Sequence, residues 1–159
     1  DTKVLYTDTA GEIKLGRVLP YHEFEKESTG LINQVTSLAP YSRLSFTVPE
    51  AGNYRISWHY IWSLNTTSSN FEAQVELDDT TILAEKAAEP QDSGGGGITL
   101  GVVGGGTAST GTDQRFKEQG FDIVNLTAGA HTVDLDWACQ VANSEATIYQ
   151  SIIEVERVS

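Results

Sequence analysis

The chain has 159 residues, which is enough to bury one hydrophobic core, so we expect a single domain. A hydrophobic fraction of 39% and a charged fraction of 20% are typical of a folded protein and exclude a disordered one. The 22 acidic and 10 basic residues give a formal net charge of -12, which argues against nucleic-acid binding. No run of eighteen apolar residues occurs, so we expect no membrane partner.

The first 40 residues precede the regularly patterned part of the chain. They contain "KVLY" and "IKLGRVLPY", and we expect residues 1–40 to form an N-terminal arm with the first strands, available as a docking segment. Residues 22–28 and 80–90 have the composition for one or two helical turns each, and Pro90 would end the second. Neither segment carries a sustained apolar stripe, so any helix should be short.

From residue 41 onward, apolar and polar side chains alternate. The alternation is clear in "RLSFTV", "YRISWHYIW", "FEAQVELD" and "HTVDLDWAC", and a longer apolar run, "ATIYQSIIEVERV", follows at 146–158. Strict alternation is typical of antiparallel strands with one face in the core and one in water. We therefore predict an all-β protein, an antiparallel β-sandwich or jelly roll of about eight strands spanning residues 41–159.

Residues 54–62 carry the largest side chains of this pattern. Tyr54, Ile56, Trp58, Tyr60 and Trp62 share one face of the predicted strand, and a slip of one residue would put all of them in water. We interpret the stripe as core. Trp62 lies at its end, next to the polar loop that contains Asn65, and we predict that these two residues contact a neighbouring subunit or a ligand.

Two Ala-Gly turns introduce similar strands. "VPEAGNYRISWHY" and "LTAGAHTVDLDW" place Gly52 and Gly129 at matching positions, where glycine can supply a positive φ. We interpret them as hairpin-like pieces of two sheets.

Residues 89–114 form a glycine-rich insertion that holds nine of the fifteen glycines. A loop of this length in a compact domain is usually functional or disordered. The spacing of a phosphate-binding loop is absent, since the next lysine is Lys117. Inside the insertion the apolar island "ITLGVV" predicts a contact with a neighbouring subunit through Ile98, Leu100, Val102 and Val103.

The chemistry-bearing residues do not form a recognisable catalytic or metal motif. His22, His59 and His131 fall on different predicted elements without metal-ligand spacing, so we interpret them as surface or boundary residues. The lone Cys139 is interpreted as a small buried apolar residue. No nucleophile elbow occurs. We therefore predict no enzyme activity and no cofactor.

Paired carboxylates leave one alternative open. Asp134 and Asp136, like Glu154 and Glu156, lie on polar strand faces, where a solvated role is expected. A calcium site that uses Asp78, Asp79 or the Asp134/Asp136 pair is the weaker alternative, because Ca²⁺ binds carboxylate and carbonyl oxygens.

The segments "LSFTVPEAGNYRISWHY" and "FDIVNLTAGAHTVDLDW", with the final strand, resemble virion proteins of tailed bacteriophages. These are head-decoration proteins and fibre or spike tips with tumour-necrosis-factor-like or C1q-like jelly rolls. The resemblance implies a capsid decoration (cement) or appendage subunit, located in the virion and assembled in the host cytoplasm. It also implies a homo-oligomer, expected to be a trimer, that binds the major capsid or another virion protein. A weaker resemblance to jelly-roll carbohydrate-binding modules implies glycan or receptor recognition as the alternative.

Overall fold

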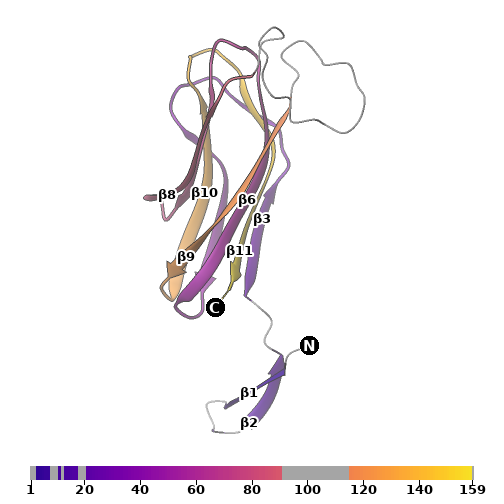
Figure 1. Cartoon of the computed structure of the whole chain (residues 1–159), viewed down its shortest axis with the longest axis vertical. Coiled ribbons are helices and arrows are strands. Elements are labelled where there is room, and N and C mark those ends of the chain that lie inside the picture. Colours follow the sequence, from indigo (N-terminus) through magenta and orange to yellow (C-terminus); the bar gives the residue numbers. More distant parts are fainter. Residues whose placement is uncertain (1–2, 8–10, 12, 18–20, 91–114, 159) are drawn as a thin grey trace, which may run out of the picture.

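The chain folds as a β-sandwich (Figure 1). The computed structural model describes residues 3–7, 11, 13–17, 21–90 and 115–158. Among these residues, one sheet has four antiparallel strands in the order β5-β10-β7-β8, and the other has the order β3-β11-β6-β9, with β4 also paired to β11. The all-β sandwich prediction is confirmed, with nine strands in the two sheets where about eight were expected. The strands are β3 (His22–Glu27), β4 (Leu31–Asn33), β5 (Ala39–Val48), β6 (Gly52–Leu64), β7 (Phe71–Leu77), β8 (Thr81–Ala88), β9 (Phe116–Leu126), β10 (Gly129–Cys139) and β11 (Ala146–Arg157).

Two further strands lie outside the sandwich. β1 (Lys3–Thr7) and β2 (Ile13–Arg17) pair antiparallel as a separate two-stranded sheet, which Figure 1 shows apart from the sandwich. β3 and β4 also fall within the first 40 residues, but both pair with β11 in the larger sheet. The docking role of residues 1–40 stays a prediction.

The two Ala-Gly turns connect the sheets, so their interpretation as hairpins was wrong. β5 and β10 belong to the four-stranded sheet, whereas β6 and β9, which the turns join to them, belong to the five-stranded sheet. Gly129 has a φ of 138°, as a tight turn requires, but Gly52 simply opens β6. Repeated crossing between two sheets is the connectivity of a jelly roll.

The two segments expected to hold helical turns are strands. Residues 22–27 form β3 against β11, and residues 81–88 form β8 against β7. Glu, Lys and Ala favour helix locally, but propensity is a weak guide without an apolar stripe, and pairing with a neighbouring strand overrides it here. Within the described ranges the structure has no helix that could cross a membrane.

The core lies between the sheets and contains the predicted aromatic stripe. Tyr54, Ile56, Trp58, Tyr60 and Trp62 of β6 are all buried, which confirms the face assignment. Cys139 is a free thiol and is buried, as predicted. At one open edge of the sandwich, Lys86 of β8 and Glu118 of β9 form an ion pair with an N···O distance of 2.8 Å. Each sheet packs one face on this core and turns its other face outward.

Candidate functional site

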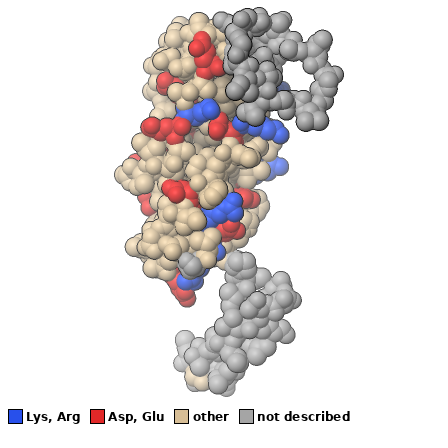
Figure 2. Space-filling view, in the orientation of Figure 1, with Lys and Arg blue, Asp and Glu red and all other residues tan. Residues whose placement is uncertain are grey.

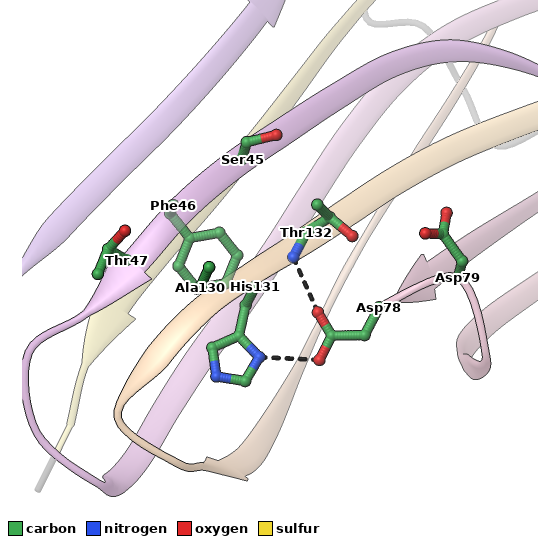
Figure 3. Close-up of a pocket in the computed structure, with 8 residues that line it drawn as sticks. All are labelled: Ser45, Phe46, Thr47, Asp78, Asp79, Ala130, His131 and Thr132. Carbon is green, nitrogen blue, oxygen red and sulfur yellow. Dashed lines mark hydrogen bonds and ion pairs between the residues drawn. The ribbon is translucent and has the colours of Figure 1, made fainter.

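A shallow hollow lies at one end of the four-stranded sheet (Figure 3). Three segments line it: β5, the turn between β7 and β8, and the start of β10. The lining residues are Ser45, Phe46, Thr47, Asp78, Asp79, Ala130, His131 and Thr132. Asp78 and Asp79 have φ values of 54° and 55°, a left-handed conformation that aspartate tolerates better than most residues. The turn directs the Asp78 carboxylate at the first residues of β10 (Figure 3).

His131 is held from two sides in this hollow. Its Nδ1 lies 2.8 Å from Oδ2 of Asp78, and its Nε2 lies 2.9 Å from the carbonyl oxygen of Thr127. The other carboxylate oxygen of Asp78 accepts a hydrogen bond of 2.9 Å from the backbone N–H of Thr132. The three contacts join the β7–β8 turn, the β9–β10 connection and β10, so we name the group formed by His131, Asp78 and Thr127 the end clamp.

The end clamp has a catalytic residue pair but not a catalytic geometry. A general base needs one free ring nitrogen to accept a proton, whereas both nitrogens of His131 face acceptors within the protein. Two acceptors are best satisfied by the imidazolium, which donates from both nitrogens. Burial lowers the pKa of His131, but the hydrogen bonds to Asp78 and Thr127 outweigh it and raise the pKa above its usual value. The arrangement suits a structural clamp.

Sequence reasoning placed His131 correctly at a boundary position but missed its partner. Asp78 is 53 residues away in the sequence, and the two meet because β10 pairs with β7. The adjacent Asp78-Asp79 pair at the end of a predicted strand was the available signal, and it carried no information about which strand lay beside it.

The expectation of a solvated Asp134 was wrong. Its side chain is only 3% exposed, and the Arg43 guanidinium donates to it while also bridging Asp79. Burial, Asp134 and Glu76 together raise the pKa of Asp136 above its usual value. One carboxylate oxygen of Asp134 and one of Asp136 lack a hydrogen-bond partner. No three His, Cys, Asp or Glu side chains converge as metal ligands in the described part of the chain, so the calcium alternative gains no support there.

The two predicted contact residues of the β6 end lie within the chain's own packing. Trp62 is 2% exposed and stacks between Phe71 and Phe116, with ring centroids 4.4 and 4.5 Å away. Asn65 joins two loops, because its Oδ1 accepts a hydrogen bond of 2.8 Å from the backbone N–H of Glu145. Their contact role stays a prediction. The other four predicted contact residues, Ile98, Leu100, Val102 and Val103, lie outside the described residues.

The outward face of the β3-β11-β6-β9 sheet carries large apolar side chains. Phe24 is 60% exposed, Phe121 59% and Ile123 54%. We name this surface, formed by the outward side chains of these four strands, the mixed face. One row across it runs Phe24, Glu154, Ser57 and Phe121, with the two aromatic residues at its ends.

A groove crosses the middle of the mixed face, where small residues leave space. Its lining includes Ser57, Gly120, Phe121 and Ile152. A Cβ on Gly120 would lie 2.7 Å from the indole Cζ2 of Trp58, so the edge of that buried ring forms part of the floor. Only the end of β9, before the second Ala-Gly turn, was predicted as strand, and the exposed position of Phe121 and Ile123 was therefore missed. The pattern "FDIVNL" does not indicate which face is buried, because its apolar residues fall on both odd and even positions.

Fold and connectivity define the class: the protein is a jelly-roll β-sandwich. No protein-family model matches the sequence, and no curated protein matches it.

Among solved structures, the chain is similar to Eiger TNF from S. frugiperda, with a TM-score of 0.53 and 10% identity over 89% of this chain and 92% of that one. It is also similar to a chain of infectious bursal disease virus, Gx strain, with a TM-score of 0.52 and 9% identity. That match covers 97% of this chain and 36% of the viral chain. The Gt strain gives the same TM-score, 0.52, at 10% identity, over 97% of this chain and 37% of the viral one. At such identities the likeness shows the fold alone, and function has to be argued from the surface.

Proposed function

We propose that the chain is a non-enzymatic structural subunit of a virion, a capsid decoration or appendage protein. It assembles as a symmetric homo-oligomer, expected to be a trimer, and binds neighbouring capsid or tail proteins. One observation carries the proposal: Phe24, Phe121 and Ile123 are more than half exposed on a single sheet face. Phe121 and Ile123 lie two residues apart on β9, and neighbouring exposed apolar side chains favour a surface that another protein covers. The jelly-roll likeness to a chain of a virus supports the virion assignment.

The end clamp supports a structural role over an enzymatic one. Its His-Asp pair is fully engaged within the protein, so neither nitrogen of His131 is available to a substrate. The contacts instead tie three connections together at one end of the sandwich, as expected of a rigid building block.

Carbohydrate binding is the second candidate, because the exposed ring of Phe121 lines a groove on the mixed face, and Phe24 exposes a second ring on the same face. A sugar platform needs open ring faces for stacking. The guanidinium of Arg55 lies 4.7 Å from the Phe121 ring centroid, and the ring of His22 stacks on Phe24 at 6.0 Å. Each ring therefore has one contact within the chain, and a sugar needs only one open ring face, so rings that are 60% and 59% exposed keep carbohydrate binding as the second candidate.

Two measurements test the proposal. Light scattering should show an oligomer of the purified chain, and the chain should bind to virus particles assembled without it. A monomer that binds members of a glycan array would contradict the structural role and favour the carbohydrate-binding module. Hydrolysis of any substrate in a glycan or ester panel would contradict both.

A further inference from the structure

The two outward sheet faces carry different charge. On the four-stranded sheet, the register of the strands places the outward carboxylates beside a single base, Arg43, among the described residues of that face. These carboxylates are Glu72, Glu76, Glu85 and Asp136, beside the buried Asp134 that Arg43 contacts. We name this surface the acidic face.

On the mixed face, the outward basic and acidic side chains nearly balance. The strand register places the bases Lys26, Arg55 and Lys117 outward together with the acids Glu154 and Glu156. Arg55 and Glu156 form an ion pair across β6 and β11 with an N···O distance of 3.0 Å. Figure 2 shows the view of Figure 1, in which basic side chains lie beside acidic ones.

This distribution matters for contacts between identical chains. Each copy carries a formal charge of -12, so two copies repel each other on approach. Contact through the acidic face would bring like charges together, which is costly, whereas contact through a near-neutral face avoids most of that cost. The near-neutral face is also the one that exposes Phe24, Phe121 and Ile123.

One of these apolar side chains, Phe121, is held in place before any partner binds. Arg55 lies over the Phe121 ring, and its ion pair with Glu156 fixes the guanidinium in turn. The backbone at Gly120 rests on the buried Trp58 ring. Side chains that are ordered in advance lose less conformational entropy on binding, so such a face associates more tightly than a mobile one of equal area.

We infer that the mixed face is the surface through which one copy of the chain binds a second copy, with Phe24, Phe121 and Ile123 as apolar anchors. The acidic face stays turned away from this contact. The inference rests on the proposed homo-oligomeric function and adds the surface and the partner.

The test uses one variant and a matched control. Phe121→Glu puts a carboxylate on β9 at one end of the row across the mixed face, whereas Ile82→Glu makes a similar change at a residue on β8 that is 50% exposed. Both positions are on the surface, so both variants should keep the circular dichroism spectrum of the natural chain. We expect Phe121→Glu to raise the dissociation constant of the oligomer about tenfold or more in light scattering across a concentration series. Ile82→Glu should leave the constant within about twofold, a change well below the tenfold that 1.4 kcal/mol represents.

The outcomes separate the two proposals. If the natural chain is monomeric at every concentration, the homo-oligomeric function itself fails. If the natural chain is an oligomer and Phe121→Glu leaves that oligomer intact, only the assignment of the contact to the mixed face is overturned. Should Phe121→Glu fail to fold, Phe24→Glu on β3 gives the same test from the opposite end of the row. An oligomer unaffected by Phe24→Glu would then overturn the inference.

Discussion

Both ring nitrogens of His131 face acceptors: Nδ1 lies 2.8 Å from Asp78 Oδ2, and Nε2 lies 2.9 Å from the carbonyl oxygen of Thr127. In the folded protein the pKa of His131 is raised above the usual histidine value of about 6.5. A raised folded pKa means that the contribution to stability is fully present below pH 6.5 and is lost as the pH rises through the folded pKa. The end clamp is therefore strongest in mild acid.

We expect His131→Gln to lower the free energy of unfolding by about 1 kcal/mol or less at pH 5.5, as for other partly exposed ion pairs. The difference from the natural chain should shrink at pH 8.5. Denaturant unfolding at both pH values measures it, with His22→Gln as the control, because the His22 ring is about half exposed and its Nε2 lies 4.0 Å from Glu154. A difference that grows with pH would contradict the clamp.

Gly120 has no side chain, so its backbone can approach the Trp58 ring closely below the mixed face. An alanine Cβ there would lie 2.7 to 3.0 Å from three atoms of a rigid, buried indole ring. We expect Gly120→Ala to destabilise the fold by about 1–2 kcal/mol, as overpacking does. Gly30→Ala is the matched control, because its Cβ would meet nothing closer than 3.8 Å. Thermal unfolding of both variants gives the comparison, and equal melting temperatures would show that Trp58 can move aside.

At the scale of elements, alternation predicted those strands that have one buried face, and it failed at the others. β5, β6 and β7 bury every second residue over most of their length and were assigned correctly. β10 was also assigned as a strand, but it buries Asp134 as well as its apolar residues. β3, β8 and β9 lie outside these regular patterns, so neither their strand identity nor their outward faces could be predicted. The sequence also did not show whether the two strands joined by each Ala-Gly turn lie in the same sheet. An Ala-Gly turn can join neighbours in one sheet or cross to the other sheet.

The same limit applies to the site. The end clamp and the mixed face both depend on which strands lie side by side, for example β10 beside β7. The alternation of apolar and polar side chains indicates that a strand is half-buried, but it contains no information about the order of strands in a sheet. Asp78 and His131 were both named from the sequence, and their pairing was not.

Trp62 gives a test at the end of β6. The stack with Phe71 and Phe116 makes it part of the core, so Trp62→Ala should lower the free energy of unfolding by about 3–5 kcal/mol. Chemical denaturation measures this loss. A residue that served only as an external contact would leave the unfolding free energy within about 0.5 kcal/mol of the natural value.

At the scale of the whole molecule, charge separates the two sheet faces, and this makes salt a probe of assembly. Repulsion between copies of charge -12 is long-ranged and is screened by added salt, whereas burial of Phe24 and Phe121 is not weakened by it. We expect the oligomer to persist or tighten between low salt and about 0.5 M salt, where the screening length is only a few ångströms. Sedimentation at both salt concentrations measures this. Dissociation by salt would indicate a contact made by ion pairs instead.

The central claim is that this jelly roll is a structural subunit that covers its exposed apolar face with another copy of itself. The molar mass of the purified chain, followed by light scattering over a concentration series at neutral pH, tests it most directly. The account predicts a mass of two or more chains, expected to be three, that falls toward one chain on dilution. A mass of one chain at every concentration would contradict it.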